Sequence, residues 1–403
     1  MACEREGLVA PPPLRPLRGK TAVLTFVAVI FAFVGETQLT QYVQTTLGYQ
    51  HSFFLFYVVH SSFVLSFPLH LGYLLMTTHH SPRALMSGLF STITAQLTLQ
   101  DPRIIHSSRF PVSRFLVVIL VMTVIYNAPA LLWFIAVVYA PVTDVTAIWN
   151  ANAFFAYVFS VKLLNLKWSL IRSCAVCLAT VGVLTIVYGD STPSNATAPL
   201  AGRTTVAQNS APLFGDILTL VASVIYGLYQ VLYKKYVALP SDLEPAAEPP
   251  QYSHVPTSAE QVDDEETVAS PSPVAGDKVA HSLPFGLHSN FLTACIGVCT
   301  LSVLWVPLIV LHYYGIEKFG LPSNMVTFVA IAGICITGVI FNAGFMILLG
   351  VWGPIVTSVG SLLTIVLTLI SDLMLGTVGL TAWGLLGAGM IVGAFAVLAY
   401  DMF

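Results

Sequence analysis

Ten runs of about 20 mostly apolar residues follow one another along this chain, each long enough to cross a bilayer as a helix. The 403 residues are 56% hydrophobic and only 9% charged, whereas a soluble domain carries about 25% charged residues. The predicted fold class is therefore an all-α membrane protein with ten transmembrane helices. The runs occupy residues 21–45, 52–75, 115–138, 142–163, 170–189, 216–236, 289–312, 325–349, 354–376 and 380–400.

The basic residues between the runs predict how the chain crosses the membrane. With a cytosolic N-terminus, all of the 16 Lys and Arg residues except Arg203 and Lys318 fall on the cytosolic side. Cytosolic loops carry such an excess, so both termini are expected in the cytosol. Residues 1–20 show no short apolar segment with a cleavage site, so the first run is expected to act as its own insertion signal. Asn195, in the sequon Asn195-Ala-Thr197, then lies in a luminal or extracellular loop as a glycosylation candidate.

The second five runs resemble the first five. Val124-Ile-Tyr-Asn127-Ala matches Val339-Ile-Phe-Asn342-Ala, and Tyr139-Ala-Pro141 matches Trp352-Gly-Pro354. Because five is odd, the second half enters from the opposite side, which makes two inverted five-helix repeats. Asn127 and Asn342 are candidates for hydrogen bonds between helices.

Two connections differ in character. Residues 238–288 hold eight prolines and nine acidic residues without apolar periodicity, which predicts a disordered linker. Residues 81–99 have apolar residues at helical spacing, which predicts a helix along the cytosolic interface. The predicted organisation is an N-terminal tail (1–20), a first repeat (21–189), a luminal loop (190–215), a sixth helix (216–236), an acidic cytosolic linker (237–288) and the remainder of the second repeat (289–403).

The ninth run carries a polar stripe along one helical face. Its members recur every three or four residues and end in a carboxylate, and hydrocarbon offers such groups no partners. We expect the stripe to line a wet pathway; the alternative is that each hydroxyl bonds to a carbonyl of its own helix or of a neighbour. The stripe consists of Thr357, Ser361, Thr364, Thr368, Ser371 and Asp372.

Other polar residues lie within the runs. Glu36 is about 24 Å along the first helix from Lys20, inside a core of about 30 Å, and an ionisable group at that depth indicates function. A structural hydrogen-bond network is the alternative for Glu36, and a solvated helix end is the alternative for Asp144. The remaining candidates for the substrate and ion pathway are Gln41, Asn152, Tyr226 and Gln230.

The charges favour a cationic or neutral solute. Six carboxylates belong to the outer side, and carboxylates in a low-dielectric cavity attract cations or protons. A phosphate-bearing substrate needs Arg or Lys in the cavity; only Lys162 is available there, and it can extend to the lipid headgroups. Cys174 and Cys177 form a CxxC, but it lies inside an apolar run, where small packing residues are expected rather than ligands. The ten histidines show no paired metal-ligand spacing, so no cofactor or metal is expected.

Several stretches resemble the drug/metabolite transporter superfamily (EamA-like), and more narrowly subfamily F of solute carrier family 35 with its fungal relatives. The similarity covers about residues 21–400, apart from the acidic linker and residues 79–114. It implies solute transport in an endomembrane, vacuole or Golgi rather than plasma membrane, and one branch of the subfamily is linked to thiamine. The stretches are Thr143-Asp144-Val145, Tyr188-Gly189-Asp190, Gly215-Asp216, Tyr226-Gly-Leu-Tyr229 with Lys234-Lys235, His312-Tyr-Tyr-Gly315-Ile316-Glu317 with Leu321-Pro322, and Gly360-Ser-Leu-Leu-Thr364-Ile365.

The sequence thus predicts a secondary transporter of a small organic solute, cationic or neutral, with a thiamine-like cation as one option and proton coupling as another. Two alternatives stay open: a nucleotide-sugar exchanger, and a polytopic scaffold or receptor without transport. We expect no enzyme, because no nucleophile–base pair or metal cluster falls at membrane depth. The expected partners are the bilayer, the solute and a coupling proton or cation, with no nucleic acid; no oligomeric state is predicted.

Overall fold

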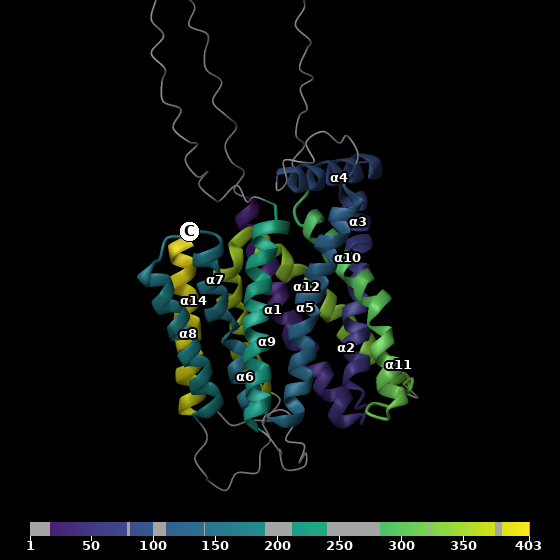
Figure 1. The fold of residues 1–403 in the computed structure, drawn as a ribbon. Coiled ribbons are helices and arrows are strands. Elements are labelled where there is room, and N and C mark those ends of the chain that lie inside the picture. Colours follow the sequence, from purple (N-terminus) through teal and green to yellow (C-terminus); the bar gives the residue numbers. More distant parts are fainter. Residues whose placement is uncertain are drawn as a thin grey trace, which may run out of the picture.

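The computed structural model describes residues 17–78, 81–99, 110–140, 142–189, 212–239, 283–322, 324–374 and 381–402, and this part of the chain is all-α. Most helices run side by side in one bundle (Figure 1). Eight segments of the described residues are long and apolar enough to cross a membrane. The helices are α1 (Leu17–Gln41), α2 (Ser52–Ser61), α3 (Ser66–Thr77), α4 (Pro82–Leu99), α5 (Val112–Tyr139), α6 (Val142–Asn150), α7 (Asn152–Leu163), α8 (Leu170–Tyr188), α9 (Pro212–Leu232), α10 (Leu287–Val303), α11 (Trp305–Tyr313), α12 (Met325–Ser361), α13 (Leu363–Met374) and α14 (Ala382–Met402).

The structure differs from two of the predicted helix boundaries. These differences explain why eight segments qualify as candidate spans where ten were predicted. The fourth run is two short helices, α6 and α7, interrupted at Ala151. Side chains on both sides of the break bind nearby carbonyls, Asn150 that of Thr146 and Asn152 that of Trp149. Such local bonds compete with the regular backbone pattern. The eighth and ninth runs lie in one 47-residue segment, Met325–Ser371.

The chain reverses direction inside that long segment. Gly353 has φ 77° and ψ 172°, a backbone conformation open to glycine, and Pro354 follows it. Along the first arm, the contacts with α1 move toward the start of α1, from Leu39 beside Gly333 to Val29 beside Gly344. Beyond Gly353, Gly360 still lies beside Phe26, since a Cβ there would be 2.9 Å from the Phe26 ring. In a straight helix, Gly344 and Gly360 would be about 24 Å apart. The two arms of α12 therefore fold back on each other at Gly353.

Two further predicted runs are interrupted near a proline. A 3₁₀ turn, Ser62–Leu65, separates α2 from α3, and Leu304 separates α10 from α11. Pro68 and Pro307 lie in the first turns of α3 and α11, where a missing N–H costs little. Each pair of helices remains one candidate span, Ser52–Thr77 and Leu287–Tyr313.

Helix α4 lies across one end of the bundle (Figure 1). Its buried side chains, Leu85, Leu89, Ile93 and Leu97, recur every four residues and pack onto the bundle. The helix predicted over residues 81–99 is therefore confirmed as a helix. The C-terminal end of α14 lies at the same end, and Phe26 near the start of α1 stacks on Phe395 near the end of α14, with ring centroids 5.1 Å apart.

The main core lies between α2, α5, α9, α10 and the first arm of α12. Helices α8 and α14 form a separate antiparallel pair on one flank, where they pack against α7 and the second arm of α12 (Figure 1). The backbones of that pair touch: a Cβ on Gly387 would lie 2.5 Å from the carbonyl oxygen of Gly182. This arrangement leaves the polar residues described next in the middle of the bundle.

Candidate functional site

Aromatic rings gather where α5, α6, α9 and α12 meet. Tyr226 and Tyr229 point from one face of α9, because residues three apart share a face. The Tyr226 ring stacks on Trp149 of α6 at 5.2 Å and on Phe345 of α12 at 6.3 Å. The Tyr229 ring lies 5.1 Å from that of Tyr126 on α5. These rings form one aromatic cluster, which we call the wall and which joins helices from both halves of the chain.

Asparagines from the two matching motifs tie this wall together. Asn342 accepts a hydrogen bond from the Tyr126 hydroxyl, and its own amide donates to the Gly338 carbonyl at 2.9 Å. The Asn127 amide donates to the hydroxyl of Thr300 on α10 at 3.1 Å. The prediction that both asparagines bond between helices is thus confirmed.

A second amide pair lies on the other side of the wall. Gln230 of α9 donates from Nε2 to Oδ1 of Asn152 on α7 at 3.2 Å, and both side chains are buried. The helices approach closely here, because a Cβ on Gly227 would lie 3.0 Å from the Asn152 carbonyl oxygen. The predicted candidates Asn152, Tyr226 and Gln230 are therefore brought together.

Some buried acceptor atoms in this region have no hydrogen-bond partner among the described residues. They include Oδ1 of Asn127, Oε1 of Gln230 and Oγ1 of Thr357. Buried polar atoms are nearly always paired, so each unpaired one calls for an explanation such as a binding role. An acceptor of this kind suits a ligand that donates N–H or O–H groups.

Glu36 approaches the same region from α1. Its Oε1 lies 3.3 Å from where a Cβ on Gly338 would be, so the absence of a side chain there admits the carboxylate. The carboxylate is also close enough to Tyr126 and Cys335 to interact with both electrostatically. Glu36 thus lies near Tyr126 and Asn342. We call these residues the central polar cluster: Glu36, Tyr126, Asn127, Trp149, Asn152, Tyr226, Tyr229, Gln230 and Asn342.

Asp144 lies apart from this cluster. Its Oδ1 accepts a hydrogen bond from the Tyr188 hydroxyl at 2.8 Å in an exposed setting. Asp216, near the start of α9, is close enough to interact electrostatically with the Asp144 carboxylate. The three residues come from α6, α8 and α9. The start of α6, the end of α8 and the start of α9 lie at the end of the bundle opposite α4 (Figure 1).

The ninth-run stripe spans the α12–α13 junction. Thr357 is 1% exposed, and its hydroxyl has no hydrogen-bond partner among the described residues. Ser361 and Thr364 each donate to the carbonyl three residues earlier, those of Ser358 and Ser361, at 2.7 and 2.6 Å. Thr368 is half-buried on α13. Ser361 and Thr364 thus show the alternative expected for the stripe, and a pathway lined by the stripe stays a prediction. The Asp372 side chain and Asn195 lie outside the described part of the structure, and Gln41 is half-buried at the end of α1.

Comparison with known proteins agrees with this architecture. No family model matches the chain. An uncharacterized transporter of Schizosaccharomyces pombe is 23% identical over 262 residues, which cover 64% of this chain and 61% of that protein. An uncharacterized vacuolar membrane protein of Saccharomyces cerevisiae is 25% identical over 186 residues, 46% of this chain and 36% of that protein. The chain is a distant relative of these fungal proteins.

The matches cover only part of those relatives, since the chain spans about three fifths of the first and about a third of the second. A protein of known crystal structure superposes with a TM-score of 0.56 at 11% identity, over 94% of this chain and 98% of the other. At that identity the likeness shows the fold alone. Together with the candidate spans, these matches describe a multi-span helical membrane protein.

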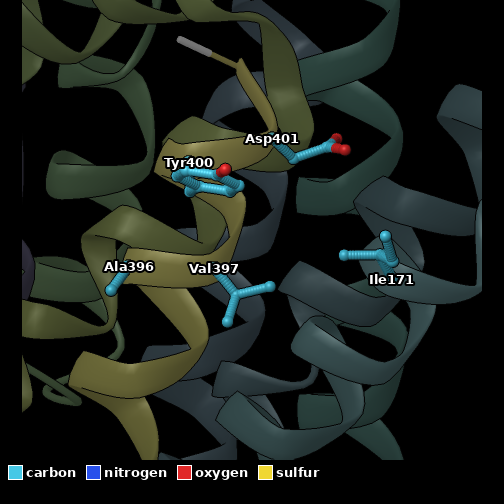
Figure 2. Close-up of a pocket in the computed structure, with 5 residues that line it drawn as sticks. All are labelled: Ile171, Ala396, Val397, Tyr400 and Asp401. Atoms are coloured by element: carbon cyan, nitrogen blue, oxygen red, sulfur yellow. The ribbon is translucent and has the colours of Figure 1, made fainter.

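Surface grooves lie elsewhere, on the flank formed by α8 and α14. Figure 2 shows one of about 540 Å³, lined by Ile171, Ala396, Val397, Tyr400 and Asp401. A second, of about 640 Å³, includes Tyr188 and Trp383. Val397 is 43% and Tyr400 89% exposed, as suits side chains that face lipid. These grooves are therefore distinct from the buried central polar cluster.

Sequence reasoning did not single out Trp149, Tyr126 or Tyr229 as members of the site. Tyr126 precedes Asn127 in the repeated motif, and Tyr229 follows Tyr226 by three residues, so spacing offered a signal for both. Trp149 had none, because its partner Tyr226 is on a helix far along the chain.

Proposed function

We propose that the protein is a secondary transporter of a small organic solute, cationic or neutral, that works by alternating access. The observation that carries this proposal is the central polar cluster, which collects a carboxylate, amides and aromatic rings inside helices long enough to cross a membrane. Polar groups at such depth are costly and mark substrate or ion pathways. The name of the fission-yeast relative, a transporter, supports the same proposal.

The proposed architecture has ten membrane segments in two inverted five-helix repeats with both termini cytosolic. Two segments add to the eight candidates. One consists of α6 and α7 together; the other arises because the first arm of α12 counts as one segment and the second arm with α13 as another. Asn127 and Asn342 would then be repeat mates, and substrate sites in such folds lie between repeats. The drug/metabolite transporter superfamily, and solute carrier family 35 subfamily F within it, fits this arrangement. The vacuolar relative supports an endomembrane location.

The chemistry of the cluster favours a cation. Glu36 is its one carboxylate. Trp149 and Tyr226 stack on each other at 5.2 Å, so a cation would meet these rings on the sides that the stack leaves open. Oδ1 of Asn127 and Oε1 of Gln230 add unpaired acceptors. A planar cation with N–H donors, such as a thiamine-like compound, uses all three features. Glu36 is also the proposed proton-coupling group, and Asp144 with Tyr188 would lie at an entrance.

Two alternatives are weaker on specific grounds. A nucleotide-sugar exchanger needs a cation for the phosphates, but the Lys162 side chain is exposed and Lys234 Nζ donates to the Gly350 carbonyl at 2.9 Å, outside the cluster. A scaffold without transport has no use for a half-buried carboxylate beside Tyr126 within a membrane span. Deletion of residues 244–277 distinguishes a scaffold from a transporter. A transporter should keep its solute flux, whereas a scaffold that recruits partners through the acidic linker should lose those partners.

Uptake into proteoliposomes tests the proposal. We expect labelled thiamine or another organic cation from a panel to accumulate, and Glu36→Gln to reduce the rate at least tenfold with unchanged folding. Asp401→Asn is the matched control, because it removes a carboxylate far from the cluster, beside Arg172, and should retain uptake. Wild-type rates in Glu36→Gln remove Glu36 from the proposal. Uptake of nucleotide sugars instead of cations contradicts the argument from charge.

A further inference from the structure

The connection between α11 and α12 reaches across to the start of α2. Glu317 accepts two backbone hydrogen bonds there, from Phe53 N to Oε2 at 2.9 Å and from Phe54 N to Oε1 at 3.0 Å. The first amides of a helix lack partners within the helix and carry partial positive charge, so a carboxylate satisfies both needs. Glu317 therefore caps a helix that is more than 250 residues away in sequence. It belongs to the His312–Glu317 motif, which the proposed solute site does not use.

A second bond fastens the same two segments. The Tyr49 hydroxyl donates to the Gly320 carbonyl at 2.7 Å. Burial, and then the nearby Glu317 carboxylate, raise the pKa of Tyr49 to about 12. A phenol with that pKa stays protonated throughout the physiological range, so it remains a donor. The rings of Phe54 and Phe319 also meet edge to face at 5.1 Å.

The two segments have features of a releasable contact. Tyr49, Glu317 and Gly320 lie between the candidate spans. The start of α2 and the end of α11, which flank them in sequence, lie at the end of the bundle opposite α4 (Figure 1). Gly48 and Gly315, each within two residues of a contact residue, have φ of 68° and 69°, and nothing lies within 4 Å of where their Cβ would be. Glycines in open space can change backbone conformation without steric cost, as hinges do.

The contact is coupled to the central polar cluster through α2. Val59 of α2 packs against Gly338, since a Cβ on Gly338 would lie 2.8 Å from the Val59 side chain. Glu36 lies beside the same glycine. Movement of α2 away from α11 and α12 therefore changes the packing next to Glu36. On the condition that the protein is a transporter, we propose that Glu317 is a clasp that closes the pathway at this end. Opening detaches it from the amides of Phe53 and Phe54, with Gly48 and Gly315 as pivots.

Distance measurement between two spin labels tests the clasp without any substrate. Gln50→Cys and Leu321→Cys place labels on exposed positions on either side of it, in a background in which the native cysteines are replaced. In Glu317→Gln, the side chain keeps one acceptor oxygen for two amides, so one charge-assisted bond is lost. We expect the ratio of long to short distances to rise about tenfold, the size associated with one such bond.

Lys318→Gln is the matched control, because it changes the charge of the exposed neighbour, and its distance distribution should equal that of the wild type. Tyr49→Phe removes one bond and keeps the ring, so it should give a smaller shift in the same direction. If Glu317→Gln lowers the melting temperature but leaves the distances unchanged, Glu317 is a static brace and the clasp is wrong. The distance measurement does not depend on solute transport. If the distances shift as expected but no solute is taken up, the proposed transport is wrong and the clasp is not contradicted.

Discussion

Substitution of Gly387 by alanine tests how tightly α8 and α14 are packed. A Cβ there would lie 2.5 Å from the carbonyl oxygen of Gly182 and 2.6 Å from Cγ1 of Ile186. The reciprocal approach is as close, since a Cβ on Gly182 would lie 2.8 Å from the carbonyl oxygen of Gly387. The carbonyl oxygens of Gly182 and Gly387 are backbone atoms, which cannot rotate away as Cγ1 of Ile186 can. The helices must therefore separate to admit one methyl group.

The expected cost follows from two opposing effects. Forced separation of a well-packed interface costs about 1–3 kcal/mol, and here it also loosens the contacts of Ile391, which is fully buried. Alanine improves helix propensity over glycine by about 1 kcal/mol. The net change for Gly387→Ala is thus a destabilisation of up to about 2 kcal/mol. Gly389→Ala, two residues further along the same helix, meets nothing within 4 Å and keeps only the gain.

The assay is thermal unfolding of the two purified variants in the same detergent, followed by intrinsic fluorescence. We expect Gly387→Ala to melt below the wild type and Gly389→Ala at or above it. Solute uptake by the fraction of Gly387→Ala that remains folded should be normal, because the pair lies away from the central polar cluster. Equal melting temperatures for the two variants would refute the close backbone contact.

Two further variants separate surface electrostatics from capping. Arg172→Gln removes the 2.7 Å ion pair with Asp401, whose side chains are 37% and 27% exposed; screening by solvent limits the expected loss to less than about 1 kcal/mol, and a larger fall in melting temperature contradicts this. Asn324→Ala removes the cap in which Oδ1 accepts from Val326 N at 3.1 Å at the start of α12; we expect a loss of about 1 kcal/mol, measured by the same melt, and Asn324→Asp should retain stability.

The helical architecture was largely predictable, because apolar length and spacing act locally. The spacing of Leu85, Leu89, Ile93 and Leu97 was enough to predict α4, since residues four apart share a face. The break at Ala151 was not predictable from hydropathy, because it accompanies bonds that Asn150 and Asn152 make to nearby carbonyls. The dipeptide Gly353-Pro354 marked the boundary between two runs, but only the contacts with α1 show that the chain turns back there.

The candidate site was predictable in part for a different reason. Depth in the membrane pointed to Glu36, and a shared helical face pointed to Tyr226 and Gln230. Hydropathy along one helix cannot show which ring on another helix it meets, so the stack of Trp149 on Tyr226 came only from the fold. The stripe of the ninth run was ambiguous because a hydroxyl can bond to its own helix, as that of Ser361 does.

The two carboxylates that the structure singles out have surroundings that suit different roles. Glu317 accepts two backbone amides between the candidate spans, where water can replace the protein donors when the contact breaks. Glu36 lies within a candidate span beside Gly338, where a lost partner is replaced less readily. A group whose partners are replaceable suits a contact that opens and closes, whereas a half-buried carboxylate within a span favours binding a cation or proton that compensates its charge. We therefore expect Glu36→Gln to reduce solute uptake and to shift the distance across the clasp less than Glu317→Gln does, because Glu36 reaches the clasp only through the packing of Gly338 against α2.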